Sequence, residues 1–295
     1  MSKEQILTIL RENRGHYTSG EEISRTLGIT RAAVWKCIRQ MEAEGYRIES
    51  ARKGYRLSDD SDAVSKNAIL RYLGDRAALY DVEVLSEVDS TNTRLLALAR
   101  QGAPEGTILI ARVQTGGKGR RGREFRSQAG GLYLSVLLRP GLPLDRLTLA
   151  TPMAAVAVLE ALEALGVSAG IKWVNDILLN GKKLCGILAE VAGPDPARPG
   201  LVLGVGVNVE QTSFPPELSG IATSLALEGY PVTVEETAEV LLGRLPDLAG
   251  DLAAGNTAAW MKSYAQNCLT LGKQVYVLSG DRRTPAYVRD LGPGG

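Results

Sequence analysis

The chain has 295 residues, of which 44% are hydrophobic and 23% are charged, and its formal net charge is +1. This length is more than one core usually fills, so we expect two or three domains. The composition is that of a soluble globular protein, no uninterrupted apolar run is long enough to cross a bilayer, and the N-terminus lacks a signal-peptide pattern, so we expect a cytoplasmic protein with no membrane partner.

Cysteine and histidine are scarce, which limits the chemistry of any site. Cys37, Cys185 and Cys268 are odd in number and far apart, which suits a reducing compartment and argues against disulfides or a cysteine metal site. His16 is the only histidine, so a histidine-based triad or a multi-histidine metal site is excluded unless His16 serves it.

The charge is unevenly spread along the chain. Residues 1–57 carry eleven Lys/Arg and seven Asp/Glu, a balance of about +4, and the remainder has a balance of about −3. We therefore expect a small basic module in front of a larger, nearly neutral body.

The basic module begins with a helical pattern. Apolar residues recur at helical spacing over residues 3–13, and Ser19 with Glu22 resembles a capping box that opens a short second helix. Residues 28–30 form a tight turn, and Arg31–Glu44 predicts a longer helix that Gly45 ends.

Two short strand-like segments, residues 46–49 and 55–57, follow and are joined across residues 51–54. Helix, short helix, turn, longer helix and hairpin together predict a winged helix-turn-helix, whose last helix enters the major groove of DNA. A small helical domain that binds protein is the alternative, but the positive charge and the wing favour DNA. The side chains expected to meet phosphates are Arg31, Lys36, Arg39, Arg52 and Lys53.

The polar residues 58–65 predict a linker. A helix is expected at 66–73 and a strand at 81–88, followed by Asp89-Ser90-Thr91-Asn92 and a helix that ends at Gly102. The four-residue segment has two interpretations, which the residues alone leave open. It is ordinary N-cap chemistry, or it is a cluster of short hydrogen-bonding side chains at a strand end.

The stretch Gly116–Ser127 is the most unusual in the chain, with five cations, one acid and four glycines. Glycine lets the backbone bend sharply and approach a ligand closely, and cations on such a loop can wrap a small polyanion. A loop that binds nucleic acid is less favoured, because no aromatic residue is interleaved through the core of the run for base stacking. The ending of a Walker A phosphate loop is also missing.

Asn180-Gly181 is a strong hairpin signal between two apolar segments. Gly204 and Gly206 lie in a predicted strand, where glycine often marks the close approach of a ligand or another backbone. The other expected elements are strands at 107–114, 131–139, 171–179, 182–190, 201–209, 273–278 and 286–289, and helices at 151–165, at 233–251 and around Trp260.

In this order along the chain, four stretches resemble the bifunctional biotin–protein ligases that also repress the biotin operon. They are residues 89–92, 117–123, 172–176 and 180–188. The resemblance implies an α+β chain with a winged helix-turn-helix, a central mixed sheet with helices like class II aminoacyl-tRNA synthetases, and an SH3-like C-terminal segment. The implied domains are residues 1–60, 66–268 and 269–295.

The resemblance also implies a reaction and partners. As a biotin–acetyl-CoA-carboxylase ligase, the protein would use ATP and Mg²⁺ to form biotinyl-5′-AMP and then transfer biotin to a lysine of a biotin carboxyl carrier protein. It would bind operator DNA as a homodimer that forms on ligand binding.

Site residues are carried over by position. The implied catalytic residues are Lys183, Arg120 and Asp176, where Asp176 holds Mg²⁺ or orients Lys183. The implied biotin-binding residues are Ser90, Thr91, Asn92, Gln114, Gly117, Lys118, Arg120 and Gly186. The implied nucleotide-binding residues are Arg120, Arg121, Arg123, Asn175 and Asn208.

The chain departs from the family pattern at several points. Lys118, Phe125 and Val174 stand where the family usually has arginine, tryptophan and proline. The C-terminal segment predicts about two of the roughly five strands of an SH3-like barrel. This leaves a second hypothesis, a metabolite-sensing repressor with weak ligase activity. A lipoyl-type ligase is a third, against which the arginine-glycine loop argues.

Overall fold

The computed structural model describes residues 2–13, 15–43, 46, 48–58, 66–193, 199–279 and 282–292. The chain divides into two compact units, Met1–Tyr72 and Leu73–Gly295. Among the sequence expectations, Gly45, the linker beyond Ser58 and residues 194–198 of the loop before the strand at 201–209 lie outside the described residues.

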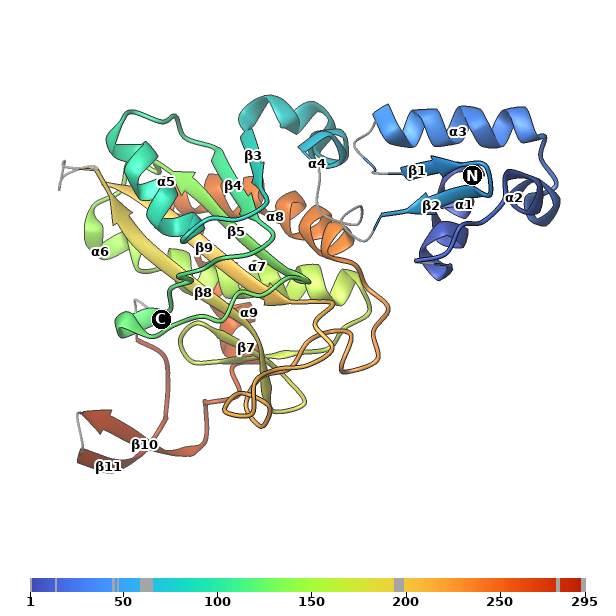
Figure 1. The fold of residues 1–295 in the computed structure, drawn as a ribbon. Helices are drawn as coiled ribbons and strands as arrows, with labels where there is room; N and C mark the ends of the chain where they lie inside the picture. The colour runs from blue at the N-terminus through green and yellow to red at the C-terminus, as the bar shows by residue number, and fades with distance from the viewer. Residues whose placement is uncertain are drawn as a thin grey trace. The chain divides into compact units, whose positions relative to one another are not determined.

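The first unit is a winged helix-turn-helix (Figure 1). Ser19 begins the second helix by accepting a 3.0 Å hydrogen bond from the Glu22 amide, and Thr30 caps the third in the same way through Ala33 at 3.1 Å. Its elements are α1 (Ser2–Glu12), α2 (Gly20–Leu27), α3 (Arg31–Ala43), β1 (Ile48–Ala51) and β2 (Gly54–Leu57).

A single apolar cluster holds the three helices and the hairpin together. It includes Ile6, Ile23, Val34, Ile38 and Leu57, all of them almost completely buried. The apolar residues at helical spacing on α1 and α3 are therefore buried in the core, as predicted, and the opposite faces of both helices are exposed.

The second unit is built on a seven-stranded mixed sheet of order β3-β4-β5-β9-β8-β7-β6, in which the pair β3–β4 is parallel and the other pairs are antiparallel. The strands are β3 (Asp81–Leu85), β4 (Thr107–Ala111), β5 (Gly131–Leu138), β6 (Gly170–Lys172), β7 (Asp176–Leu179), β8 (Lys182–Ala192) and β9 (Gly200–Asn208). The helices and turns of this unit are η1 (Gly74–Leu79), α5 (Thr91–Arg100), η2 (Arg120–Gly122), α6 (Leu144–Leu147), α7 (Ala150–Ala164), α8 (Val234–Ala254) and α9 (Ala258–Asn267). The helix α4 (Lys66–Leu73) belongs to the first unit except for its last residue.

Helices cover both faces of this sheet (Figure 1). Leu95 and Ala99 of α5 pack against Leu137 and Val202, whereas α7 packs with α8 and α9. Leu144–Ala164 is the one described segment with the length and apolar character of a membrane span, although the charged residues Asp145, Arg146, Glu160 and Glu163 interrupt it. Because 72% of it is buried, it is accounted for as a core segment of this unit.

Two predicted elements differ from the structure. The segment expected as one strand at 171–179 is split into β6 and β7, and the last strand is β11 (Arg282–Tyr287) instead of residues 286–289. β11 pairs antiparallel with β10 (Gln274–Ser279). Neither difference can be predicted from the local sequence, because pairing with the neighbouring strands sets where each of these strands begins and ends.

Candidate functional site

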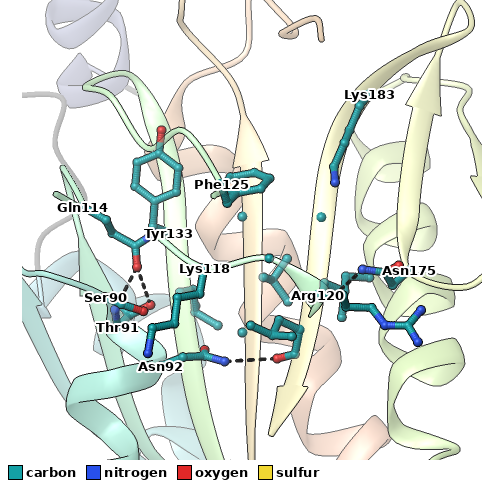
Figure 2. Close-up of a pocket in the computed structure, with 18 residues that line it drawn as sticks. Ser90, Thr91, Asn92, Gln114, Lys118, Arg120, Phe125, Tyr133, Asn175 and Lys183 are labelled. Carbon is teal, nitrogen blue, oxygen red and sulfur yellow. Dashed lines mark hydrogen bonds between the residues drawn. The ribbon is translucent and has the colours of Figure 1, made fainter. Parts of the chain in front are cut away.

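A pocket with about 460 Å³ of space, part of it continuous with solvent, lies on the α5 face of the sheet (Figure 2). Cross-strand partners Ser135 and Gly204, and likewise Tyr133 and Gly206, put β5 and β9 on its floor. Its lining residues are Ser90, Thr91, Asn92, Gln114, Lys118, Gly119, Arg120, Phe125, Tyr133, Leu134, Asn175, Lys183, Gly186, Ile187, Leu188, Gly204, Val205 and Gly206.

One end of the pocket is lined by short polar side chains. Ser90 is the N-cap of α5 and accepts from the Thr93 amide at 3.4 Å, so the N-cap interpretation is confirmed. Thr91 donates from its amide (2.8 Å) and its hydroxyl lies 3.0 Å from the same oxygen, Gln114 Oε1 (Figure 2). Gln114 in turn donates to Ser127 Oγ at 2.8 Å. Both interpretations of the segment 89–92 therefore hold, since one turn caps a helix and lines a pocket.

The loop Gly116–Ser127 folds back on itself as an irregular hairpin. The Phe125 amide donates to the Gly117 carbonyl (2.9 Å), and the Gly119 amide donates to the Arg123 carbonyl (2.7 Å). Gly117 is buried where a Cβ would overlap the Phe125 carbonyl and Ser127 Oγ, so this glycine is needed for close approach. Lys118 and Arg120 line the pocket, while Arg121 and Arg123 are exposed and do not.

The Phe125 ring lies over the sheet inside the pocket. A Cβ at Gly206 would sit 2.6 Å from this ring, and one at Gly186 would sit 2.9 Å from it. The ring meets Tyr133 edge-on at 6.3 Å between centroids, and Lys183 Nζ lies 5.5 Å from its centroid. Because these two glycines have no side chains, the Phe125 ring can pack directly against the backbone of β8 and β9.

Lys183 and Asp176 form an ion pair at the other end of the pocket. Nζ of Lys183 is 2.6 Å from Oδ1 of Asp176, with the two side chains about one third and one quarter exposed. The lysine lines the pocket, and the aspartate is behind it and does not. This geometry supports the orienting role for Asp176.

The backbone around Lys183 is held by a segment far along the chain. The Lys183 amide donates to the Ile221 carbonyl (2.8 Å), and the Thr223 amide donates to the Lys183 carbonyl (2.9 Å). Asn180 in the hairpin turn and Thr223 both donate to the Glu228 carboxylate at 2.5 Å, and these hydrogen bonds, that of Thr223 first, lower the pKa of Glu228. The backbone of Lys183, the catalytic candidate, is therefore held in place by hydrogen bonds from residues 221–228.

Two asparagines predicted near the nucleotide differ in position. Asn175 lines the pocket and donates to the Ile187 carbonyl at 2.8 Å. Asn208 is buried, donates to the Thr223 carbonyl at 2.9 Å, and is not among the lining residues. Among the described residues, no group of three or more His, Cys, Asp or Glu could hold a metal ion. The Asp176 carboxylate lies beside the pocket and is paired with Lys183, and the Glu190 carboxylate lies behind Asn92 at the other end.

The exposed face of α3 carries the cations predicted for DNA. Arg31, Lys36 and Arg39 are exposed, and Arg39 lies 5.6 Å from the exposed Trp35 ring and forms a 2.9 Å ion pair with Glu42. The helix pattern alone does not predict this contact between Arg39 and the Trp35 ring.

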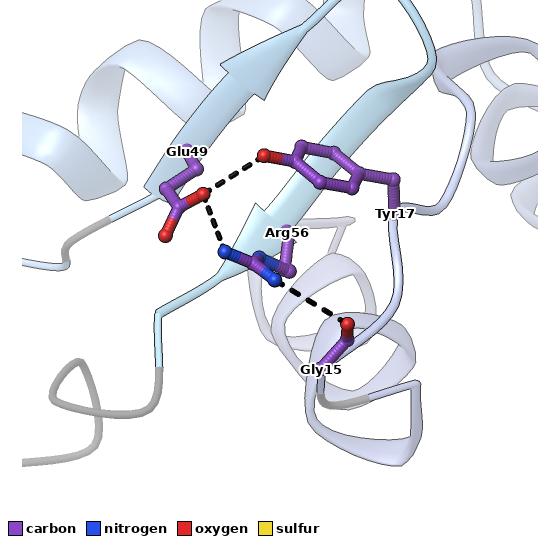
Figure 3. Close-up of polar contacts among 4 residues, drawn as sticks. All are labelled: Gly15, Tyr17, Glu49 and Arg56. Atoms are coloured by element: carbon purple, nitrogen blue, oxygen red, sulfur yellow. Dashed lines mark hydrogen bonds and ion pairs between the residues drawn. The ribbon is translucent and has the colours of Figure 1, made fainter.

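The wing is fixed by a second polar cluster (Figure 3). Glu49 accepts from the Tyr17 hydroxyl (2.8 Å) and from Arg56 (2.7 Å). Lys53 at the exposed hairpin turn lies 4.4 Å from the Tyr17 ring, and Arg52 beside it is exposed. The hydrogen bonds from Tyr17 and then Arg56 lower the pKa of Glu49, and its carboxylate ties Tyr17 and Arg56 together beside the hairpin.

The structure thus brings together nine of the predicted ligand residues around one pocket and leaves five outside its lining. The nine are Ser90, Thr91, Asn92, Gln114, Lys118, Arg120, Asn175, Lys183 and Gly186; the five are Gly117, Arg121, Arg123, Asp176 and Asn208. Sequence reasoning missed Tyr133, Leu134, Ile187, Leu188 and Val205 as lining residues. Burial raises the pKa of the Tyr133 hydroxyl, which donates to the Gln128 carbonyl at 2.6 Å. Ile187 and Leu188 lie in the stretch 180–188 that carries the family resemblance, whereas no motif marks the other three residues.

Comparison with known proteins gives two family matches. Residues 84–208 match the biotin/lipoate A/B protein ligase family, and residues 2–56 match a helix-turn-helix domain family. The first match covers the strands and loops that line the pocket, and the second covers the winged helix.

Curated relatives extend over most of the chain. It is 39% identical to the bifunctional ligase/repressor BirA of Bacillus subtilis, over 76% of this chain and 70% of the relative. It is 34% identical to the biotin–acetyl-CoA-carboxylase ligase of Mycobacterium tuberculosis, over 74% of this chain and 83% of the relative. Among solved structures, the Aquifex aeolicus biotin protein ligase in complex with biotin and ATP matches with 31% identity and a TM-score of 0.60, over 70% of this chain and 86% of that one.

Proposed function

Because the chain belongs to the biotin–protein ligase family, we propose that it attaches biotin to a lysine of a biotin carboxyl carrier protein and represses transcription through its helix-turn-helix domain. The observation that carries the ligase function is the polarity of the pocket. Short polar groups line one end, and Lys183 stands at the other. A molecule with a neutral polar head and a carboxylate tail, such as biotin, matches this arrangement.

The first step joins two anions. One oxygen of the biotin carboxylate attacks the α-phosphorus of ATP, a new P–O bond forms, and the bond to pyrophosphate breaks, giving biotinyl-5′-AMP. Fixed cations lower the repulsion as charge develops on the phosphorus oxygens. Lys183 supplies such a charge, and its 2.6 Å contact with Asp176 holds the ammonium in place.

The second step needs an intermediate that survives until the carrier arrives. The lysine amine of the carrier attacks the acyl carbon, AMP leaves, and an amide forms. Water would cleave the mixed anhydride, so the site must exclude it. Arg120 at the tip of the loop 116–127 lines the pocket and is proposed to close over the adenylate.

Magnesium fits this site only in part. Mg²⁺ is usually held by one or two carboxylates together with phosphates and water. Asp176 is the carboxylate at the Lys183 end of the pocket and is already paired with that lysine. We therefore propose that ATP phosphates and water hold most of the ion, which would supply charge neutralisation, and that Asp176 contributes at most one oxygen.

We assign DNA binding to the exposed cations of α3 and the wing, namely Arg31, Lys36, Arg39, Arg52 and Lys53. A single module of this size would bind mostly through phosphates, whereas two modules on a dimer would read two half-sites. Residues 1–60 are the proposed DNA-binding domain, 66–268 the catalytic domain and 269–295 a partial SH3-like segment. The proposed location is the cytoplasm.

One experiment tests the ligase function directly. The full chain is incubated with ATP, Mg²⁺ and biotin, and biotinyl-AMP is detected by mass spectrometry; lipoate competes in a parallel reaction. Formation of biotinyl-AMP that lipoate does not suppress supports the proposal. Lipoyl-AMP in its place would favour a lipoyl ligase, and biotinyl-AMP without transfer to a carrier domain would favour the repressor with weak ligase activity.

A further inference from the structure

A buried chain of hydrogen bonds lies behind the polar end of the pocket. Ser135 on β5 is completely buried and its Oγ lies 2.6 Å from Asn92 Oδ1 and 2.7 Å from Thr91 Oγ1. Asn92 is also buried, and its Nδ2 lies 2.8 Å from the Glu190 carboxylate and 3.3 Å from the Leu188 carbonyl. Ser135 and Glu190 do not line the pocket, so they act on a ligand only through others.

The Asn92 amide has one orientation in this chain. A carboxylate and a carbonyl oxygen only accept, so the group that faces Glu190 and Leu188 must be the NH₂, and Oδ1 faces Ser135. Gly204 makes room for the amide, since a Cβ at this position would overlap Asn92 Oδ1.

The amide orientation fixes the hydroxyl of Ser135. Two buried oxygens 2.6 Å apart repel each other unless a hydrogen lies between them, and Asn92 Oδ1 has none to give. Ser135 therefore donates to Asn92 and has no hydrogen left for Thr91.

The hydroxyl of Thr91 is fixed in turn. It lies 2.7 Å from Ser135 Oγ and 3.0 Å from Gln114 Oε1, and both of these oxygens can accept its hydrogen. The 2.7 Å contact needs a hydrogen between its two oxygens, and Ser135 has none left to give, so Thr91 donates its hydrogen to Ser135. Thr91 then faces the pocket with a lone pair only.

We propose that Ser135 is a positioning residue that makes Thr91 a hydrogen-bond acceptor toward the ligand, so that the pocket selects a head group with an N–H donor. The proposal rests on the proposed function, because it concerns how the ligase recognises the head of its substrate. The ureido ring of biotin supplies N–H donors, and the dithiolane ring of lipoate supplies none. The choice between head groups then depends on whether the Thr91 hydroxyl accepts or donates a hydrogen bond, and the shape of the pocket stays the same.

The test compares biotin with its two cyclic carbamate analogues, in each of which one ureido N–H is replaced by a ring oxygen. For the analogue changed at the N–H that faces Thr91, an acceptor meets an acceptor, and we expect the wild type to prefer biotin about 100-fold in kcat/KM. In Ser135→Ala the acceptor at 2.7 Å is gone, and the Thr91 hydrogen is shared between Gln114 Oε1 and the ligand. We expect the preference to fall to about tenfold, the KM for biotin to rise about tenfold and the KM for ATP to stay unchanged.

The ratio of two kcat/KM values does not depend on how much of a variant is folded. Ser135→Cys, of similar volume and with a weaker donor, is expected to give an intermediate ratio and replaces the alanine variant if that one does not fold. Thr237→Val is the control, because it removes a buried hydroxyl that bonds the Thr233 carbonyl on α8, away from the pocket. An unchanged ratio in the Ser135 variants, or an equal fall in Thr237→Val, would overturn the proposal. A wild type that forms no biotinyl-AMP would instead refute the proposed function.

Discussion

Replacing Lys183 by alanine is expected to slow adenylate formation far more than it weakens biotin binding. Nζ of Lys183 is 2.6 Å from Asp176 Oδ1 and borders the pocket, so its loss removes a cation and leaves a carboxylate facing two anionic substrates. Two unit charges about 4 Å apart interact by about 4 kcal/mol at an effective dielectric constant of about 20. Both side chains are partly exposed, which roughly halves this value to about 2 kcal/mol.

A loss of about 2 kcal/mol in the transition state corresponds to about a 30-fold fall in rate. The assay is pyrophosphate release at saturating ATP and biotin, with the biotin Kd measured separately by calorimetry; we expect that Kd to rise less than the rate falls, because the cation acts mainly as charge develops. Lys182→Ala is the matched control, since it removes the neighbouring lysine, which does not line the pocket.

Removing the Asp176 carboxylate, which Lys183→Ala leaves without its ion-pair partner, provides an internal check. In the double variant Lys183→Ala/Asp176→Asn, the repulsion from Asp176 is gone, so part of the lost rate should return. Pyrophosphate release that is unchanged in Lys183→Ala, or reduced to the same extent in Lys182→Ala, would refute the assigned role of Lys183.

The remaining predictions concern the loop, the dimer and the wing. Arg120→Gly is expected to keep making biotinyl-AMP but to release it, so labelling of bystander lysines rises; the control Arg126→Gly, at a residue outside the pocket lining, should not show this, and equal labelling in both would exclude a lid. Biotinyl-AMP, more than biotin, is expected to promote dimerisation, because loops already ordered by ligand cost less entropy at an interface; sedimentation that shows a monomer at saturating ligand, together with ligand-independent operator binding, argues against it. Tyr17 and Arg56 hold the pKa of Glu49 below its ordinary value, so the ionised group stabilises the wing at a pH above that ordinary value, and this stabilisation is lost as the pH falls through the lowered pKa. Hydrogen exchange of β1 and β2 should therefore lose more protection in wild type than in Glu49→Gln on acidification, and an identical loss in both would contradict the assignment.

Local chemistry explains which parts of the fold were predictable. Ser19 and Thr233 begin helices in the structure as their side chains predict, and Asn180 and Gly181 both have positive φ in the expected tight turn. These features depend on residues within one turn of each other. The split between β6 and β7 does not, because it depends on which strand lies alongside.

The site divides in the same way. The cationic loop and the Asn180-Gly181 turn are contiguous motifs, so Arg120 and Lys183 could be proposed as ligand residues before the fold was known. Ser135 has no motif, and it shares the partner Asn92 with Leu188 because both are cross-strand partners of Gly204. Register of this kind is a property of the whole sheet, and a single sequence does not reveal it.

The brace behind Lys183 also bears on how the length of the chain can change. Gln211 is tied to Tyr133 through its side chain and to Ser224 through its carbonyl, and Ile221 and Thr223 are bonded to Lys183. Between these two anchors, residues 212–220 have neither helix nor strand. Insertions and deletions there would be absorbed by the surface, since long surface loops tolerate them well. A single residue added between Ile221 and Glu228 would shift the lysine. Lineages and engineered variants should therefore differ in length on one side of Ile221 and keep a constant count on the other.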